Sequence, residues 1–257
     1  MRRGDIKMNI LELIGRLYPA VTDSDRKAGN IHYYAQSSIT CYVIKGKHGD
    51  LLIDTGMPQI WDGLKHWLAK YDVRYVLLTH AHADHDWNAR KLQRTGIKIL
   101  LSERDKTLRQ NYMSQRVKPT LPKYTFRNYT QWINGSIFRS PAYDADRYFC
   151  SNERDLLHEL SFSADIIPLP GHTLGSVGVM SNGVLYCGDA FTALWKRPDI
   201  TPHAVSPKLM RKSLERMAAL SPEWLACGHG LPIRFEKALP VIEEYLSKGK
   251  KNLEKRI

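Results

Sequence analysis

The sequence lacks several features that would place it in a specialised class of proteins. Apolar runs such as Val76-Leu77-Leu78 are far shorter than the roughly 20 residues that cross a bilayer. No stretch rich in proline, glycine and serine divides the 257 residues into two halves. The four cysteines form no Cys-x-x-Cys pair, which argues against a disulfide framework and against a thiolate zinc site.

A secretory signal peptide is not indicated either. The N-terminus is basic, but Glu12 lies inside the stretch that would have to form the apolar core of such a peptide. We therefore expect a cytoplasmic protein without a membrane partner.

The chain carries a net charge of +12, which results from 38 basic and 26 acidic residues. Such a charge attracts anions, and by itself it does not distinguish nucleic acid, an acidic membrane surface and a small anionic substrate. The basic residues are dispersed, whereas nucleic-acid surfaces usually interleave basic and aromatic side chains on one face. We therefore expect a small-molecule substrate and do not favour a nucleic-acid partner.

Apolar and β-branched runs predict a series of strands, and residues with helical spacing predict helices between them. The predicted strands are Ile39–Ile44, Leu51–Ile53, Tyr75–Leu78, Ile97–Leu100, Ile166–Leu169, Val177–Met180, Val184–Cys187 and Trp224–Ala226, and the predicted helices are Ile60–Lys70, Trp87–Arg94, Pro207–Leu220 and Ala238–Leu246. A turn-forming stretch separates the first two strands, which are expected to form a hairpin. The alternation that follows indicates an α/β protein.

Residues 103–160, between the two halves of this pattern, are polar and aromatic and show little clear periodicity. This segment is too long for a simple connection, and long loops in compact domains tend to form lids or binding segments. We expect one domain over residues 1–257, with residues 103–160 as an inserted, lid-like segment.

Four ligand-type side chains lie within six residues in Thr79-His80-Ala81-His82-Ala83-Asp84-His85, directly after an apolar strand. In such a loop alternate side chains point the same way, while the next turn brings the last two toward a second point. Burying or exposing so many titratable groups in one loop has no packing benefit. The pattern fits two adjacent metal positions better than one.

Three more ligand-type residues follow later strands, each beside a glycine. They occur in Gly171-His172-Thr173, Gly188-Asp189 and Gly228-His229-Gly230. Glycine permits tight turns and a close approach of the backbone. Imidazole and carboxylate groups are the ligands of a zinc-type ion, which keeps a position open for water when it is catalytic.

The order of these motifs resembles the metallo-β-lactamase superfamily. The resemblance covers residues 39–233 and rests on His-x-His-x-Asp-His at 80–85, Pro-Gly-His-Thr-x-Gly-Ser at 170–176, Gly188-Asp189 and the late Gly-His-Gly at 228–230. It implies an α/β fold of four layers, an αβ/βα sandwich in which two packed mixed β-sheets are flanked by helices.

The resemblance also implies a role for each ligand-type residue. One metal ion would be held by His80, His82 and His172, the other by Asp84, His85 and His229, with Asp189 bridging the two. Asp54 matches an early aspartate of the family that resembles a group orienting the histidine loop from behind the ligands. The expected cofactors are two divalent metal ions, zinc before iron or manganese.

Two such ions, about 3.5–4 Å apart, lower the pKa of a shared water from about 15.7 toward ~7. The resulting metal-bridging hydroxide would attack an ester, thioester or lactone of a small anionic substrate, with Asp84 as the catalytic base that the family suggests. The pattern is more similar to glyoxalase II-type thioesterases and acyl-homoserine lactonases than to true β-lactamases. His203 and the tyrosines of the inserted segment are candidate proton donors that the sequence does not place.

Other activities share the pattern and are kept as alternatives. Persulfide dioxygenases resemble the chain in the Thr-His-x-His-Ala-Asp-His stretch and use a single iron. The superfamily also contains nucleases, and the basic charge keeps phosphodiester cleavage open. A metal-stapled binding module is disfavoured, because seven ligands leave coordination positions open that a structural site would close.

Overall fold

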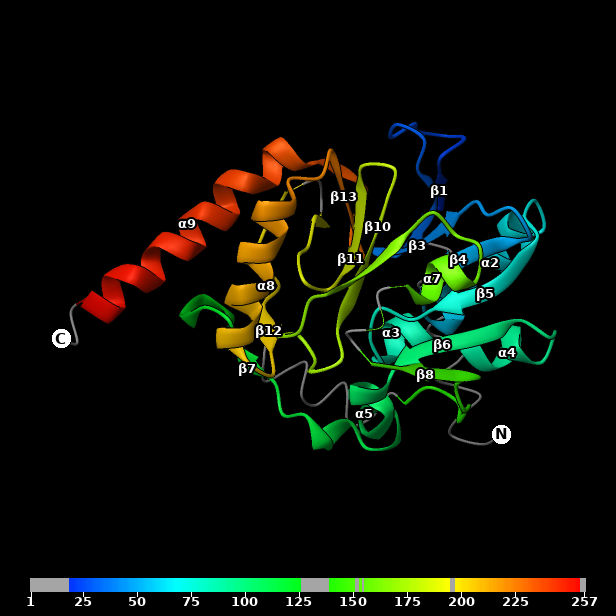
Figure 1. The fold of residues 1–257 in the computed structure, drawn as a ribbon, viewed down its shortest axis with the longest axis horizontal. Coiled ribbons are helices and arrows are strands. Elements are labelled where there is room, and N and C mark those ends of the chain that lie inside the picture. The colour runs from blue at the N-terminus through cyan, green and yellow to red at the C-terminus, as the bar shows by residue number, and fades with distance from the viewer. Residues whose placement is uncertain (1–18, 126–138, 151–152, 154, 195–196, 255–257) are drawn as a thin grey trace.

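The structure is a computed structural model of the chain and describes residues 19–125, 139–150, 153, 155–194 and 197–254. Its strands form a seven-stranded sheet in the order β1-β2-β3-β4-β5-β6-β8, a five-stranded sheet in the order β14-β13-β11-β10-β9, and the small pair β12-β7. In Figure 1 the two large sheets lie between α8 and α9 on one side and α2 and α4 on the other. The chain therefore folds as four layers, helix, sheet, sheet and helix, as the family resemblance implied.

The bounds of the elements are as follows. The seven-stranded sheet contains β1 (Val21–Thr22), β2 (His32–Gln36), β3 (Ile39–Ile44), β4 (Asp50–Ile53), β5 (Val73–Leu77), β6 (Lys98–Ser102) and β8 (Arg147–Phe149). The five-stranded sheet contains β9 (Asp165–Pro168), β10 (Val177–Ser181), β11 (Val184–Gly188), β13 (Trp224–Cys227) and β14 (Ile233–Arg234), and the small pair is β7 (Lys118–Pro119) with β12 (His203–Ala204). The α-helices are α2 (Trp61–Leu68), α3 (Ala83–Asp86), α4 (Ala89–Gln93), α5 (Lys106–Gln110), α7 (Leu156–Glu159), α8 (Pro207–Leu220) and α9 (Phe235–Glu254), and short 3-10 helices cover Pro58–Ile60, Glu103–Asp105, Tyr112–Ser114 and Pro122–Tyr124.

Both large sheets are mixed. In the first sheet β1 to β4 pair antiparallel, and β4, β5, β6 and β8 then run parallel. In the second sheet β11 and β13 are parallel, and the outer pairs are antiparallel. Parallel neighbours bring their carboxyl ends to the same edge of a sheet, so the loops after β11 and β13 lie together at one edge of the second sheet, as the loops after β4, β5 and β6 do in the first.

Alternate side chains of β3 pack into two different core clusters, one on each face of the sheet. Tyr42 and Ile44 face the other sheet, where the Tyr42 ring meets that of Tyr186 at 5.3 Å between centroids. Cys41 and Val43 point the opposite way, toward the helices that cover the first sheet. The run of six buried residues is therefore a strand with apolar packing on both faces, which is why its pattern is continuous.

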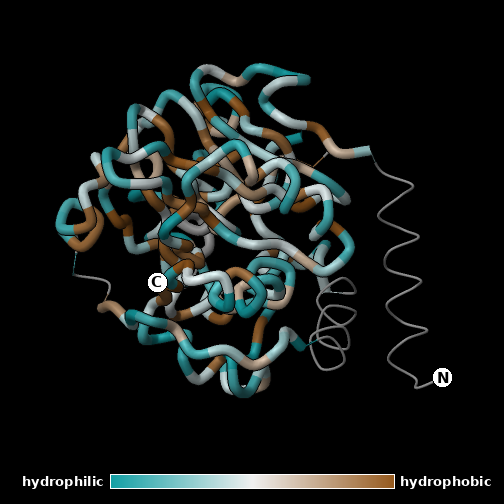
Figure 2. Tube along the Cα trace, turned by 90° about the vertical axis from the view of Figure 1, so that its right-hand side faces the viewer, coloured by the Kyte–Doolittle hydropathy of each residue, from teal (hydrophilic) through white to brown (hydrophobic). Residues whose placement is uncertain are grey.

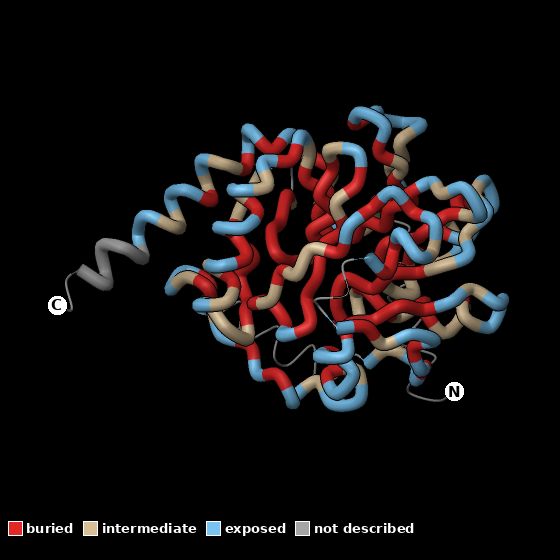
Figure 3. Tube along the Cα trace, viewed as in Figure 1, coloured by how far each residue is buried: buried red, intermediate tan, exposed pale blue. Residues whose placement is uncertain are grey.

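The outer helices close the remaining faces with their apolar sides. Trp67 of α2 packs in the core over the first sheet, while Met210 and Leu214 of α8 and Ile242 of α9 pack over the second. Apolar segments accordingly lie inside and polar ones outside (Figure 2), and the central strands are buried along their length (Figure 3). In the part of the chain that the structure describes, no helix combines the length and apolar character that crossing a membrane requires.

The predicted strands and helices are confirmed, with Ile39–Ile44 and Pro207–Leu220 matching to the residue. The expected hairpin is the antiparallel pair β3 and β4. The segment at 103–160 holds α5, β7, β8, α7 and short 3-10 helices, and its residues 126–138, 151–152 and 154 lie outside the described chain. Its role as a lid stays a prediction.

Candidate metal centre

The histidine loop follows β5 and is shaped by hydrogen bonds to both sheets. Thr79 O accepts from Val177 N at 2.9 Å, which fixes the loop against the second sheet. His85 N donates to His82 O at 2.9 Å as the short helix α3 begins. This turn separates His80 and His82 from Asp84 and His85, so the loop presents ligand-type groups to two neighbouring points.

One of these points is surrounded by three imidazoles, which we call the histidine-only group (His80, His82 and His172). One ring nitrogen from each lies within 4.8 Å of the others. His172 Nε2 approaches His82 Nδ1 to 2.9 Å, and the ring centroids of the three pairs are 4.7 Å apart. All three side chains are buried. His172 Nδ1 is turned away from the group and donates to the backbone oxygen of His203 at 2.9 Å.

The second point is surrounded by the mixed group (Asp84, His85 and His229), whose ligand atoms also lie within 4.8 Å of one another. His229 Nε2 is 3.2 Å from Asp84 Oδ2, and His229 Nδ1 faces the backbone oxygen of Ser38 at 3.2 Å. The Asp84 side chain is 24% exposed, against 1% for His85. The mixed group is thus the more open of the two.

Asp189 lies between the two groups. Its Oδ2 is 3.6 Å from His172 Nε2 on one side and 3.3 Å from His229 Nε2 on the other. Its Oδ1 is 3.4 Å from His85 Nε2. This carboxylate is therefore within reach of both points, in the place where a bridging ligand would be needed. A side chain at Gly228 would not fit beside it, because a Cβ there would lie 2.7 Å from Asp189 Oδ1.

Asp54, at the end of β4, stands behind this arrangement. The residue is buried and its backbone is left-handed, with a φ of 59°. Its Oδ1 accepts from Thr79 N, and its Oδ2 accepts from Thr79 Oγ1 and faces His85 Nδ1, each at 2.8 Å. The carboxylate thus directs the other ring nitrogen, His85 Nε2, toward the mixed group.

The two groups differ in their affinity for protons. Burial and repulsion from His85 lower the pKa of His80 well below its usual value. Burial and the nearby His172 lower the pKa of His82 to about 3. The imidazoles of the histidine-only group that show these shifts are therefore neutral at pH 7, with lone pairs available for a metal ion.

Carboxylates reverse this effect in the mixed group. Burial alone would lower the pKa of His229, but Asp189 and Asp84 outweigh burial and raise this pKa to about 10. Burial would raise the pKa of Asp189, yet His229 and His85 hold it well below its usual value. The ionised Asp189 therefore lies where the two groups meet, and the proton that it favours on His229 would have to leave before a cation binds there.

The residues fit a pair of metal ions by their donor chemistry and by their unsatisfied atoms. Among the described residues, His80 Nε2, His85 Nε2 and Asp189 Oδ1 are buried without a hydrogen-bond partner. The same three residues each offer one ligand atom to a set whose members lie within 4.8 Å of one another. Buried polar atoms are normally satisfied, and imidazole nitrogens with a shared carboxylate are ligands typical of zinc, iron and manganese.

A pocket of about 140 Å³ opens onto these groups. It is lined by residues of both groups and by Ser38, Thr192, Leu194, Thr201, Pro202 and His203. His203 was one of the proton donors that the sequence could not place, and it lies here on β12. Sequence reasoning missed Ser38 and Thr192, because isolated hydroxyl residues in turns carry no distinguishing pattern. No lysine or arginine is among the described residues that line the pocket.

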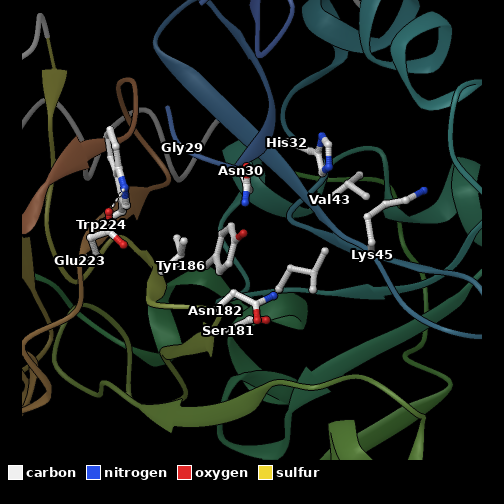
Figure 4. Close-up of a pocket in the computed structure, with 12 residues that line it drawn as sticks. Gly29, Asn30, His32, Val43, Lys45, Ser181, Asn182, Tyr186, Glu223 and Trp224 are labelled. Atoms are coloured by element: carbon white, nitrogen blue, oxygen red, sulfur yellow. Dashed lines mark hydrogen bonds between the residues drawn. The ribbon is translucent and has the colours of Figure 1, made fainter. Parts of the chain in front are cut away.

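A larger pocket of about 350 Å³ lies elsewhere, between the start of β13, the β10–β11 hairpin and the end of β3 (Figure 4). The basic side chains that line it form ion pairs with carboxylates that are not among its lining residues. His32 pairs with Asp23 and Lys45 pairs with Asp50, each at 2.8 Å. Size alone therefore does not identify the functional site, and the smaller pocket with its converging ligand atoms is the better candidate.

Several known proteins are similar to this chain in sequence or in fold. An uncharacterized protein of Bacillus subtilis (strain 168), YobT, is 27% identical over 219 residues, covering 76% of this chain and 84% of that protein. A hydroxyacylglutathione hydrolase of Pseudomonas fluorescens (strain SBW25) is 41% identical over 70 residues, which is 27% of this chain and 26% of that enzyme. The solved structure of TTHA1623 in a di-iron-bound form superposes with a TM-score of 0.58 at 22% identity, covering 87% of this chain and 98% of that one.

The profile of one family matches the larger part of the sequence. It is described as the metallo-beta-lactamase superfamily, and the match extends over residues 35–229. This range contains the histidine loop, His172, Asp189 and His229, together with both large sheets except the strands β1 and β14 and the first three residues of β2. The chain therefore belongs to the metallo-beta-lactamase superfamily.

Proposed function

We propose that the protein is a dinuclear metal-dependent hydrolase that cleaves an ester, thioester or lactone of a small substrate. The observation that carries this proposal is the position of Asp189 between two groups of three ligand-type side chains. Two bound ions would supply Lewis-acid chemistry, because they lower the pKa of water and polarise a carbonyl oxygen. In this proposal the histidine-only group holds one ion, the mixed group holds the other, and Asp189 bridges them.

We propose two divalent ions, with zinc as the first choice. The five imidazoles and two carboxylates of the site suit zinc, iron and manganese alike. The di-iron form of TTHA1623 shows that a protein of similar fold holds iron, so metal analysis has to decide the identity. An iron-dependent reaction, such as that of a persulfide dioxygenase, would appear in the same analysis as one iron per chain.

Asp84 is the residue to which we assign proton transfer. It lines the pocket, its side chain is partly exposed, and it approaches His229 Nε2 to 3.2 Å. Burial would raise the pKa of Asp84, but His85 and His229 hold it below its usual range, so the carboxylate is ionised at pH 7, which is the state that a base requires. Ser38, Thr192 and His203 offer further hydrogen-bonding side chains around the same space.

The substrate class rests on the pocket and on a partial relative. A volume of about 140 Å³ suits a small reacting group with the remainder of the substrate outside. The match to a hydroxyacylglutathione hydrolase includes 70 residues and supports a thioester among the candidate bonds. An anionic substrate is supported by the net charge of +12, which acts over long range.

Metal content combined with a substrate panel tests the proposal. Purified protein is analysed for bound metal and assayed with esters, thioesters, lactones and phosphodiesters. His82→Ala should lose metal and turnover, whereas His48→Ala, at an exposed histidine in the β3–β4 turn, should keep both. Two ions with carbonyl hydrolysis are expected. Phosphodiester cleavage, or oxygen uptake on a glutathione persulfide with one iron, would replace the proposal by the corresponding alternative.

A further inference from the structure

A buried carboxylate outside the predicted ligand set joins the two loops that carry the histidine-only group. Asp105 ends the 3-10 helix after β6. Its Oδ2 accepts from Ala81 N at 3.2 Å and from Thr173 Oγ1 at 2.7 Å. Its Oδ1 accepts from Gly175 N at 2.9 Å and from Gln115 Nε2 at 3.1 Å. Four donors therefore converge on a single side chain.

These contacts fall next to the imidazoles along the chain. Ala81 lies between His80 and His82, and Thr173 directly follows His172. The first loop belongs to the seven-stranded sheet, and the second follows β9 of the five-stranded sheet. One oxygen atom, Asp105 Oδ2, thus connects the two loops whose separation decides whether three imidazole nitrogens can share an ion.

The surroundings are shaped to admit this carboxylate. A Cβ at Gly175 would lie 2.6 Å from Asp105 Cγ and Oδ1, so only glycine leaves room for it. The neighbouring Gln115 donates to Asp105 and accepts from Leu174 N at 2.7 Å. Asp105 and Gln115 therefore hold the loop after His172 by several hydrogen bonds, and small displacements of this loop are resisted.

We propose that Asp105 is a positioning residue that fixes His172 against His80 and His82 and so sets the metal affinity of the histidine-only group. This inference rests on the proposed function, because it takes that group to be a metal site. Within the described part of the chain, the hydrogen bonds of Asp105 reach Ala81, Thr173, Gly175 and Gln115 and do not reach the mixed group. Its removal should therefore affect one of the two ions.

Titration of the metal-stripped protein with Zn²⁺ tests this, and Co²⁺ provides a visible spectrum of each occupied site. Asp105→Asn keeps the shape of the side chain but places an NH₂ group against at least one backbone or side-chain donor. We expect about 10- to 100-fold weaker binding of one ion, the range seen when groups behind metal ligands are changed, with the other ion unchanged. The Co²⁺ spectrum of one site should change while the other is retained.

Matched variants separate a positioning role from a general loss of folding. Asp146→Asn changes another carboxylate of the same segment, which accepts from Ile99 N at 3.0 Å on the outer side of β6, and should leave both affinities unchanged. Thr173→Val removes one partner of Asp105 Oδ2 and should weaken the same ion by a smaller factor. This milder variant decides the question if Asp105→Asn does not fold, as judged by circular dichroism.

The results distinguish this inference from the proposed function. If the unsubstituted protein binds no more than one ion, the dinuclear proposal fails first. If it binds two ions, and Asp105→Asn or Thr173→Val binds both as tightly, Asp105 is not a positioning residue. Equal weakening of both ions by these variants would also overturn the inference, because it would show that the effect is not specific to the histidine-only group.

Discussion

The histidine-only group and the mixed group lie on either side of Asp189, but the chain supports them in different ways. The first has no carboxylate of its own and is buried, and burial together with the nearby His172 lowers the pKa of His82 to about 3. The second contains Asp84, is partly open to the pocket, and has a His229 pKa of about 10. The comparison shows that one carboxylate within a ligand group changes its protonation: a cation that binds the mixed group has to displace a proton, whereas the imidazoles of the histidine-only group with lowered pKa are already neutral.

The largest effect is expected when the residue common to both groups is removed. Asp189→Ala should weaken both ions by more than about 100-fold, since changes behind metal ligands already reach that value. Metal content and turnover measure the loss. Asp165→Ala on β9, an exposed aspartate that pairs with His158, is the control. If Asp189→Ala still bound two ions tightly, the histidine-only group and the mixed group would not share Asp189 as a ligand.

Acidity should separate the two groups next. The raised pKa of His229 means that the metal-free mixed group binds a proton at pH values below about 10, and a metal ion has to displace it. As the pH is lowered below this pKa, the metal affinity of the mixed group should therefore fall by about tenfold per pH unit for each displaced proton. The metal affinity of the neutral histidine-only group should change less. Zinc titrations at several pH values, with proton release measured by calorimetry, test this. Equal pH dependence at both sites would contradict it.

A smaller and more local effect is expected at Asp54. Asp54→Asn removes the charge that faces His85 Nδ1 and should weaken the mixed group by about 10- to 100-fold. Asp50→Asn at the other end of β4 is a matched control, because it also changes a buried carboxylate, which there accepts from Asp72 N at 3.0 Å. The control should lower the melting temperature without changing metal affinity. If Asp54→Asn and Asp50→Asn weakened metal binding equally, Asp54 would have no specific role in orienting His85.

The smallest effect is expected in the pocket shown in Figure 4. Trp224→Ala removes a partly buried ring that packs against the core and over which Arg234 lies at 4.5 Å, so it costs stability but touches no ligand-type group. A lower melting temperature and an unchanged kcat/KM are expected. A clear loss of kcat/KM would mean that this pocket, and not only the metal centre, takes part in turnover.

Much of the fold could be predicted from the sequence where one physical signal dominates. Ile39–Ile44 is buried throughout and mainly apolar because it packs on both faces, and α8 has Ser206 as its cap, Pro207 in its first turn and Ser221 beyond its end. By contrast β2 (His32–Gln36) was missed, since polar residues at both of its ends obscure the alternation. The strand is defined by its pairing with β3, which no local pattern reveals.

The site was predictable to the extent that ligand-type residues cluster in sequence or follow strands beside glycines. His80, His82, Asp84 and His85 form such a cluster, and the structure brings His172, Asp189 and His229 to them. Their roles as metal ligands stay a prediction until metal is measured. Asp105 could not be recognised, because it lies in the charged run Glu103-Arg104-Asp105-Lys106, which is typical of an exposed turn. Its contacts with Ala81, Thr173 and Gly175 join residues far apart in the sequence, which no local pattern reveals.

The ligand-type side chains come from both halves of the sandwich. Those of the histidine loop follow β5 of the first sheet, whereas His172, Asp189 and His229 follow strands of the second. Ions held by both sets would bind the folded chain in preference to the unfolded one and would act as cross-links between the sheets. At a free metal concentration of 1,000 times the Kd, one such site adds about 4.1 kcal/mol to the free energy of unfolding. Chelation should therefore speed amide hydrogen exchange first at Val177 N and Thr40 N, which bond across the two sheets at this end.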